Sequence, residues 1–183
     1  MSTAAEADPV KLAVSILAAD RGLAAEVIKD LSGHFGKADF ISEWLDFHYT
    51  DYYEREMGPG LARRLITFED LVRPESLPDI KKITNGIEDR CRENGRRKVN
   101  IDPGYLNRCH FILATGKPYA HRPYLRDGVY ADVTLVYRAG SFQSLEWTYP
   151  DYAGETLAGL LGMIREKYLL QLRELKNISD EGN

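Results

Sequence analysis

The first forty residues combine the two periodicities of regular secondary structure. Apolar residues alternate with other residues over 10–18, which predicts a strand. Asp20 then stands where a helix N-cap is expected, and Gly36 stands where a helix would stop. Between them an apolar residue recurs every fourth position, at Leu23, Val27, Leu31 and Phe35. The sequence therefore predicts a strand followed by an amphipathic helix.

The middle of the chain repeats this order with weaker signals. The aromatic-rich stretch 38–49 predicts a second strand, and 61–68 a third strand after a turn at 56–60. A second helix is expected to begin at Ser76 or Pro78 and to end at Asn94-Gly95. Its apolar stripe consists of Ile80, Ile83 and Ile87. Two further stretches, 98–102 and 109–115, are predicted to be extended.

The C-terminal part has the clearest pattern. Strict alternation over 129–138, a turn at Ala139-Gly140 and a second run at 142–147 predict a β-hairpin. We expect the second hairpin strand to persist to Pro150. Asp151 is then expected to cap a final helix over 153–175. The buried stripe of that helix is predicted to be Leu157, Leu160, Leu161, Ile164, Tyr168 and Leu172.

This order of elements predicts an α+β fold. The simplest arrangement is a ferredoxin-like βαββαβ core, with a mixed or antiparallel sheet and an added C-terminal β-hairpin and helix. A mixed sheet with a different strand order is the main alternative. The chain contains no linker and no repeat, so residues 1–183 are expected to form one domain, with 1–9 and 177–183 as flexible tails.

Composition narrows the classes of partner. A net charge of −4 and a pI near 5.6 argue against nucleic acid and against an anionic membrane surface. The N-terminus lacks the pattern of a signal peptide, and no apolar run is long enough to cross a bilayer. Cys91 and Cys109 match neither a metal site nor a disulfide framework, so they are expected to be unbonded thiols. These observations predict a soluble, cytoplasmic protein.

The distribution of tyrosine is the strongest anomaly in the sequence. All eleven tyrosines lie between Tyr49 and Tyr168, many of them beside acids or prolines. They concentrate in four stretches, "YTDYYEREMG", "IDPGYL", "HRPYLRDGVY" and "EWTYPDY". Tyrosine has an apolar ring and a polar tip, so such a group suits either the half-wet rim of a sheet or a ligand cleft. Both interpretations stay open at this point.

The same motifs resemble a known family. "DYYEREMG", "NIDPGYL", "YADVTLVYRAGSF" and "EWTYPDY" together look like a bacterial domain of unknown function, number 4416. The resemblance covers nearly the whole chain. It implies a stand-alone bacterial protein without an established activity, and therefore brings no catalytic residue to this sequence. A standard GTPase is excluded, because the chain contains no G-x-x-x-x-G-K-[ST] phosphate loop.

Two charged stretches offer further chemistry. The basic run at 90–98 is either a solvated helix end, which the helix dipole favours, or an anion site to which Arg63 and Arg64 would add. His48, Asp51 and Glu54 have a spacing that would allow a metal site, although a solvated acidic face explains them equally well. We therefore predict no metal site, and the sequence does not identify a cofactor.

The leading hypothesis is a protein that binds, or acts on, a small anionic metabolite or nucleotide. Arginines would hold the anion, tyrosines would contact the organic part, and Asp102 or Glu146 would act as general base. The proposed site consists of Tyr52, Tyr53, Arg64, Asp102, Tyr105, His121, Arg122, Glu146 and Tyr152. The alternative is a non-enzymatic interaction module that binds a partner protein or a second copy as a homodimer.

Overall fold

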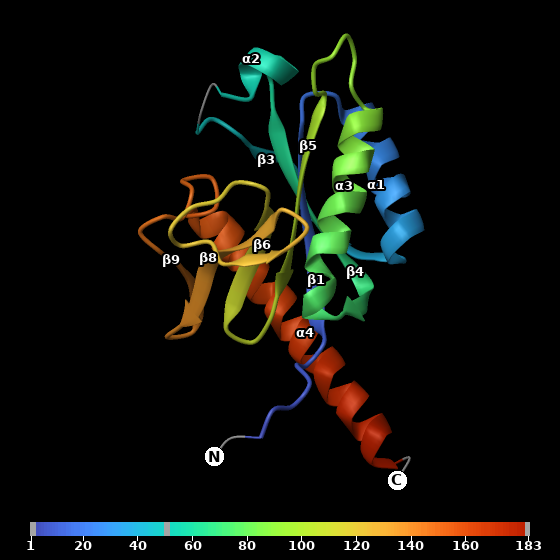
Figure 1. Ribbon diagram of the computed structural model, residues 1–183, viewed down its shortest axis with the longest axis vertical. Helices are drawn as coiled ribbons and strands as arrows, with labels where there is room; N and C mark the ends of the chain where they lie inside the picture. The colour runs from blue at the N-terminus through green and yellow to red at the C-terminus, as the bar shows by residue number, and fades with distance from the viewer. Residues whose placement is uncertain (1–2, 50–51, 182–183) are drawn as a thin grey trace.

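A nine-stranded sheet forms the centre of the computed structural model, which describes residues 3–49 and 52–181 (Figure 1). The strands are β1 (Val10–Ala18), β2 (Ala38–Ile41), β3 (Leu45–Asp46), β4 (Ala62–Val72), β5 (Val99–Leu106), β6 (His110–Thr115), β7 (Tyr124–Arg126), β8 (Val129–Arg138) and β9 (Ser141–Ser144). They follow the order β2-β4-β1-β5-β6-β8-β7, with β3 paired to β4 and β9 paired to β8. Every pairing is antiparallel. The α+β class is confirmed, and the ferredoxin-like core stays a prediction.

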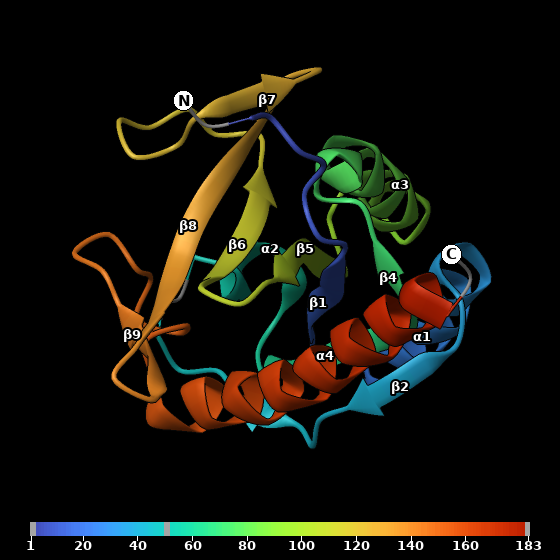
Figure 2. The ribbon, with the colours of Figure 1, turned by 90° about the horizontal axis from the view of Figure 1, so that it is seen from below.

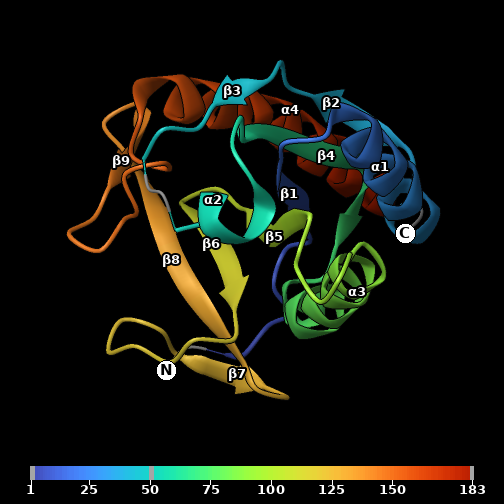
Figure 3. The same cartoon turned by 90° about the horizontal axis from the view of Figure 1, so that it is seen from above.

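Helices cover both faces of the sheet. They are α1 (Arg21–Phe35), α2 (Glu54–Met57), α3 (Leu77–Arg90) and α4 (Glu155–Glu181), and a 3-10 turn at Pro74–Ser76 leads into α3. Helices α1 and α3 lie on one side of the sheet, whereas α4 crosses the other side (Figures 2 and 3). The sheet is therefore the middle layer of the molecule.

The two hydrophobic cores follow from the alternation of side chains along the strands. On β1, Leu12, Val14 and Ile16 pack against α1 and α3, whereas Ala13 faces the core beneath α4. The predicted helix stripes supply the other halves of these cores. In α4 the buried members include Leu161, which has no exposed surface. Because both faces of β1 are covered, all nine of its residues are buried.

Local signals fixed the start of α1 as predicted. The Asp20 carboxylate accepts hydrogen bonds from the backbone N–H groups of Gly22 (2.7 Å) and Leu23 (3.1 Å), and Gly36 forms the C-cap. The predicted end of the last helix was too early, because α4 continues to Glu181. No glycine or proline interrupts the chain between 163 and 181, so local sequence allows the helix to run on.

The predicted strand over 38–49 is two short strands instead. Backbone and side chain of Ser42 both bond to Leu65: its N–H donates to the Leu65 carbonyl (2.9 Å), and its hydroxyl accepts from the Leu65 N–H (3.0 Å). The side chain thereby replaces a ladder contact and separates β2 from β3. Helix α2 and strand β7 were not predicted, because four and three residues are too few to establish a periodicity.

The predicted helix end at Asn94-Gly95 was wrong, because α3 stops at Arg90. Asn94 and Gly95 have φ values of 50° and 75°, and the N–H of Arg96 donates to the Glu93 carbonyl over 2.9 Å. Positive φ at both central residues is typical of a type I′ turn, which Asn-Gly favours. The dipeptide therefore forms a tight turn after the helix.

The hairpin strand before α4 also ends earlier than predicted. Strand β9 stops at Ser144, and a turn follows instead of continued pairing to Pro150. The Thr148 hydroxyl accepts from the Leu145 N–H (2.7 Å) and donates to the Thr134 carbonyl (2.6 Å). The Trp147 indole N–H donates to the Val133 carbonyl over 2.9 Å. These side-chain contacts fasten the loop to β8 and end the ladder.

The structure bears on two predictions from the sequence, the state of the cysteines and the absence of a membrane-spanning helix among the described residues. Cys91 and Cys109 are free, as predicted, and only Cys109 is exposed. Within residues 3–49 and 52–181, no helix combines the length and the apolar character that crossing a bilayer requires.

Candidate functional site

The sheet splits between β5 and β6. Strand β5 pairs with β1 along its whole length, and β6 pairs with β8 along its whole length. By contrast, β5 and β6 pair with each other only where 104–106 face 111–113. Beyond Gly104 the two strands diverge. A wedge-shaped opening is therefore left between the first half of β5 and the end of β6.

Gly104 stands at the apex of this wedge. A Cβ atom at this position would lie 2.3 Å from the Ile112 carbonyl oxygen and 2.8 Å from the Leu113 side chain. Only glycine allows the two backbones to approach so closely. The preceding residue, Pro103, has no N–H to donate to a further ladder bond. The "IDPGYL" motif thus occupies the point where the strands separate.

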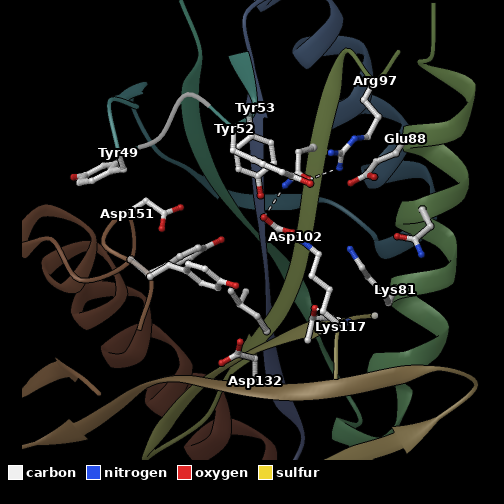
Figure 4. A pocket seen from close by; sticks show the side chains of 18 of the residues that line it. Tyr49, Tyr52, Tyr53, Lys81, Glu88, Arg97, Asp102, Lys117, Asp132 and Asp151 are labelled. Carbon is white, nitrogen blue, oxygen red and sulfur yellow. Dashed lines mark hydrogen bonds between the residues drawn. The ribbon is translucent and has the colours of Figure 1, made fainter. Parts of the chain in front are cut away.

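A cavity of about 670 Å³ occupies the wedge (Figure 4). Ligand pockets commonly measure ~300–1,000 Å³, so the space suits a small metabolite. Aromatic side chains line much of it, namely Phe47, Tyr49, Tyr52, Tyr53, Tyr149 and Tyr152. The charged lining residues are four cations, Lys81, Arg97, Lys117 and Arg122, and four carboxylates, Glu88, Asp102, Asp132 and Asp151. The segment around α2, helix α3, three strands and the loop before α4 all contribute.

Two arginines of the wall are held by their own carboxylates. Arg122 donates to Asp132 over 2.8 Å, to the Lys117 carbonyl over 3.1 Å and to the Tyr149 hydroxyl over 3.2 Å. Arg97 donates twice to the Glu56 carboxylate, over 2.7 and 2.9 Å. These guanidinium groups are therefore committed to shaping the wall.

A second, deeper ion pair supports the inner end of the cavity. Arg63 is buried, ion-paired to Asp151, and donates to the Ser15 hydroxyl over 2.9 Å. Its guanidinium lies 4.3 Å from the centroid of the Tyr152 ring. The predicted role of Asp151 as the cap of the last helix was therefore wrong. Helix α4 begins at Glu155, and the Asp151 carboxylate accepts a hydrogen bond from Arg63 of β4.

Two lysines face the cavity without a carboxylate of their own. Among the described residues, neither Lys81 nor Lys117 has a carboxylate within ion-pair distance. Lys81 donates to the Ile101 carbonyl over 3.1 Å, and the Lys117 ammonium lies 5.5 Å from the Tyr52 ring centroid. Lys117 is exposed and Lys81 is half-buried. Both ammonium groups are therefore available to an anion in the cavity.

Carboxylates gather at the inner end, with Asp102 in the middle of the view in Figure 4. Burial raises the pKa of Glu88, and Asp102 adds to this effect. Burial, followed by the charges of Asp102 and Asp151, likewise raises the pKa of Tyr53. Asp102 accepts one hydrogen bond, from the Asn100 amide over 2.7 Å. Negative charge is therefore concentrated on the side of the cavity that Glu88, Asp102 and Asp151 line.

The Tyr152 hydroxyl lies near Asp102 and Asp151. Tyr152 is only 3% exposed, and burial raises the pKa of its hydroxyl strongly. The hydroxyl lies close to Ser15 and Arg63, but it has hydrogen-bond geometry to neither, nor to any other described residue. We call Ser15, Arg63, Asp102, Asp151 and Tyr152 the floor cluster. It is a polar group with unused hydrogen-bonding capacity.

The structure brings five of the nine residues proposed from sequence to this cavity. They are Tyr52, Tyr53, Asp102, Arg122 and Tyr152. The other four lie outside its lining. Arg64 points away from the neighbouring Arg63, since successive side chains of a strand alternate; its guanidinium lies 4.9 Å from the Trp44 ring centroid. Glu146 is exposed on the turn after β9.

Tyr105 and His121 are close in sequence to cavity residues but serve other contacts. Tyr105 lines a smaller hollow of about 320 Å³ that also involves Tyr168. His121 is stacked between Tyr119 and Trp147, with ring centroids 5.9 and 4.9 Å away, and its Nε2 atom lies 3.9 Å from Asp132. It therefore packs behind the Arg122–Asp132 pair.

Sequence reasoning missed several polar and charged residues of the wall. Lys81, Asn85 and Glu88 recur at the spacing of one helix face, beside the apolar stripe of α3. This polar stripe was a usable signal. Asp132 lies on the polar side of the alternating β8 pattern and therefore resembled a solvated residue. Its burial became visible only with the loop that carries Arg122.

The remaining charged candidates are mostly neutralised. Within the basic run at 90–98, Arg90 pairs with Asp30 (2.6 Å), Arg92 with Asp89 (2.9 Å) and Lys98 with Glu93 (3.3 Å). Of the weighed metal residues, Asp51 lies outside the described part of the chain. Within that part, no three His, Cys, Asp or Glu side chains form a group that could hold a metal ion.

The fold and the cavity together define an α+β protein with a single antiparallel sheet that is split around a metabolite-sized, tyrosine-rich cavity. The chain belongs to the family named domain of unknown function (DUF4416), whose model matches residues 8–168. This confirms the resemblance that the sequence motifs indicated. No curated protein and no solved structure is significantly similar to the chain.

Proposed function

We propose that the protein binds a small anionic metabolite that contains a flat ring, of which a nucleotide is the prime example. The observation that carries this proposal is the 670 Å³ cavity, which combines tyrosine rings with two lysines that have no carboxylate partner among the described residues. Rings stack on aromatic side chains, and ammonium groups attract phosphate or carboxylate. A nucleotide offers both features at once.

The exposure of the lining residues indicates how the ligand is oriented in the cavity. Lys117, Tyr49, Tyr52 and Tyr149 are exposed and form the mouth, whereas Tyr152 and the rest of the floor cluster are buried or half-buried. Placing the charged phosphate at the mouth, beside Lys117, keeps it partly hydrated. The ring then enters between the tyrosines. The opposite orientation would bring the phosphate toward Glu88, Asp102 and Asp151, where like charges repel.

If the bound molecule undergoes a reaction, Asp102 is the candidate general base. Its carboxylate faces the cavity and makes one hydrogen bond, to Asn100, so it has acceptor capacity for a ligand proton. Glu146, the other carboxylate considered from sequence, is exposed outside the cavity and has no part in the proposal.

A thermal-shift series tests the binding. Nucleoside monophosphates at millimolar concentration should raise the melting temperature, since a ligand of the native state stabilises it by mass action. The matching nucleosides, which lack the phosphate, should give a smaller shift. The absence of a shift with every nucleotide and with other phosphorylated ring compounds would contradict the proposal.

Variants of neighbouring lysines identify the site. Lys117→Met and Lys81→Met should each weaken nucleotide binding by about tenfold, the equivalent of about 1.4 kcal/mol. Lys82→Met is the matched control, because Lys82 is adjacent in α3 but exposed and paired with Asp127 at 2.7 Å. Equal loss in all three variants would point to a general charge effect. Binding titrations at constant ionic strength make this comparison.

Self-association is the second candidate function. Helix α4 projects past the edge of the sheet (Figure 1) and exposes Met163 (59%), Leu170 (55%) and Ile178 (69%). At 100° per residue these side chains lie within one face of the helix. Such a face suits a second copy of the chain. Light scattering on the wild type and on Leu170→Lys would reveal a dimer and its loss.

The cytoplasmic location is also part of the proposal. An exposed free cysteine, Cys109, suits a reducing compartment. Cell fractionation of a bacterial host that carries the gene would test it.

A further inference from the structure

The floor cluster contains more hydrogen-bond acceptors than donors. An ionised carboxylate offers about four acceptor positions and no donor. Asp102 uses one of them for the Asn100 amide, over 2.7 Å, and has no cation within ion-pair distance among the described residues. Asp151 shares its charge with Arg63. Asp102 is thus the carboxylate of the floor that retains unfilled positions toward the cavity.

The neighbouring guanidinium groups are committed elsewhere. Arg63 serves Asp151 and Ser15, and Arg97 serves Glu56 and Asn100. The chain therefore does not supply Asp102 with a further donor from these groups. A desolvated carboxylate that lacks partners is unfavourable, so a ligand that displaces water from the floor must bring a donor itself.

Tyr152 provides an independent sign of unused hydrogen-bonding capacity. The residue lines the cavity, and its buried hydroxyl makes no hydrogen bond with any described residue. Buried polar groups in native proteins are almost always hydrogen-bonded, either to protein or to a bound molecule. A hydroxyl can accept one hydrogen bond from a ligand that also donates to the carboxylate beside it.

We propose that the ligand presents an amino group to Asp102 and Tyr152, and that in a nucleotide this group is the exocyclic amine of the base. This inference rests on the proposed nucleotide-like ligand and specifies which end of it is recognised. One N–H donates to the Asp102 carboxylate and the other to the Tyr152 oxygen. A base with a carbonyl oxygen at that position would direct an acceptor at the Asp102 carboxylate, which is repulsive, and only the Tyr152 hydroxyl could donate to that oxygen.

Two pairs of nucleotides differ in this feature. Cytidine and uridine monophosphate differ by an amine or an oxygen on the pyrimidine ring, and adenosine and inosine monophosphate differ likewise on the purine ring. Calorimetric titration of the wild-type protein should show tighter binding of the amino member in at least the pair whose ring size fits. The expected preference is about tenfold or more.

The variant Asp102→Asn tests the assignment of the floor. An amide offers both a donor and an acceptor, so the preference for the amino member should fall to about threefold or less, a difference near 0.65 kcal/mol. The bond from Asn100 can be kept, because the new side chain retains an oxygen. Asp89→Asn on the exposed side of α3 is the control and should keep the wild-type preference.

The possible failures are distinguishable. If phosphorylated rings bind but amino and carbonyl members bind equally well in wild type, the recognition of an amine is wrong and the proposed function stands. If the preference persists unchanged in Asp102→Asn, other residues bind the amino group, and its assignment to the floor cluster is wrong. If no nucleotide binds at all, both the proposed function and this inference fail. Because the wild-type comparison needs no variant, the inference remains testable should Asp102→Asn not fold.

Discussion

Two buried polar clusters differ in how completely their hydrogen-bonding groups are satisfied. Beneath α4, Lys11 is completely buried and donates to Asp39 (2.5 Å), to the Phe68 carbonyl (2.5 Å) and to Gln171 (2.8 Å). Asp39 in turn accepts from Lys167 at 2.7 Å and from Thr67 at 2.5 Å. We call these five side chains, Lys11, Asp39, Thr67, Lys167 and Gln171, the α4 network. In the floor cluster, by contrast, the Tyr152 hydroxyl has no partner and Asp102 has one.

The difference separates a structural cluster from a candidate binding site. In the α4 network every ammonium donor of Lys11 is satisfied within the chain, and the contacts join α4 to the sheet. Burial lowers the pKa of Lys11 in spite of Asp39; burial alone would raise the pKa of Asp39, but the hydrogen bonds from Lys11 and Lys167 hold it below its ordinary value. A closed network stabilises the fold, whereas an open one retains capacity for a ligand.

The largest effect is expected where the closed network is broken. Lys11→Met should destabilise the protein by about 3–5 kcal/mol, because it leaves the buried Asp39 carboxylate without its main partner. Lys37→Met is the control, since the Lys37–Glu69 pair is exposed and should leave the denaturation midpoint nearly unchanged. Chemical denaturation of both variants makes the comparison. Equal midpoints would show that the α4 network does not stabilise the fold.

The apex of the wedge should be the next most sensitive position. Gly104→Ala should cost about 1–3 kcal/mol, because the new methyl group has to displace the Ile112 backbone. Gly159→Ala in α4 is the matched control. No atom lies within 4 Å of a Cβ there, so alanine should stabilise the helix by up to about 1 kcal/mol. A stable Gly104→Ala variant with unchanged ligand binding would mean that the apex does not fix the cavity.

The buried Glu88 carboxylate should weaken the fold at neutral pH. Because burial raises the pKa of Glu88 above 4.5, the folded state binds the proton more tightly than the unfolded state. Stability should therefore fall as pH rises from 4.5 through the raised pKa. Glu88→Gln should remove this loss and gain on the order of 1 kcal/mol at neutral pH, with no gain in acid.

Denaturation midpoints across this pH range measure the effect. Glu26→Gln on the exposed side of α1 is the control and should follow the wild-type profile. A Glu88→Gln profile that runs parallel to wild type at every pH would show that the Glu88 carboxylate is not penalised by its burial.

The smallest stability effect should come from the floor cluster itself. Tyr152→Phe keeps the ring beside Arg63 and removes a hydroxyl that makes no hydrogen bond, so stability should change by less than about 0.5 kcal/mol. Tyr168→Phe is the matched control. Its hydroxyl donates to the Pro9 carbonyl over 2.9 Å, so this loss should cost about 1 kcal/mol. The reverse order of the two melting temperatures would place Tyr152 in a structural network instead of a binding site.

Local sequence was sufficient for most of the elements and for part of the candidate site. The apolar stripes of α1, α3 and α4 and the hairpin of β8 and β9 follow from side-chain periodicity, which is a property of neighbouring residues. Each of the four tyrosine-rich motifs contributes side chains to the lining of the cavity. Five of the nine proposed residues line the cavity, because they lie in segments that border the split between β5 and β6.

Only the tertiary structure decided how these side chains are used. Arg63 and Arg64 are equivalent in sequence, yet the pairing of β4 with β1 directs Arg63 to Ser15 and to Asp151, 88 residues away. Lys11 looks like the polar position of an alternating strand until α4 covers it with Gln171, 160 residues later. The wedge exists because the β1–β5 and β6–β8 pairings are each complete, whereas β5 and β6 pair with each other over three residues only. Periodicity determines which face of an element is apolar, but the partners of a buried charge come from distant segments, and no local pattern records them.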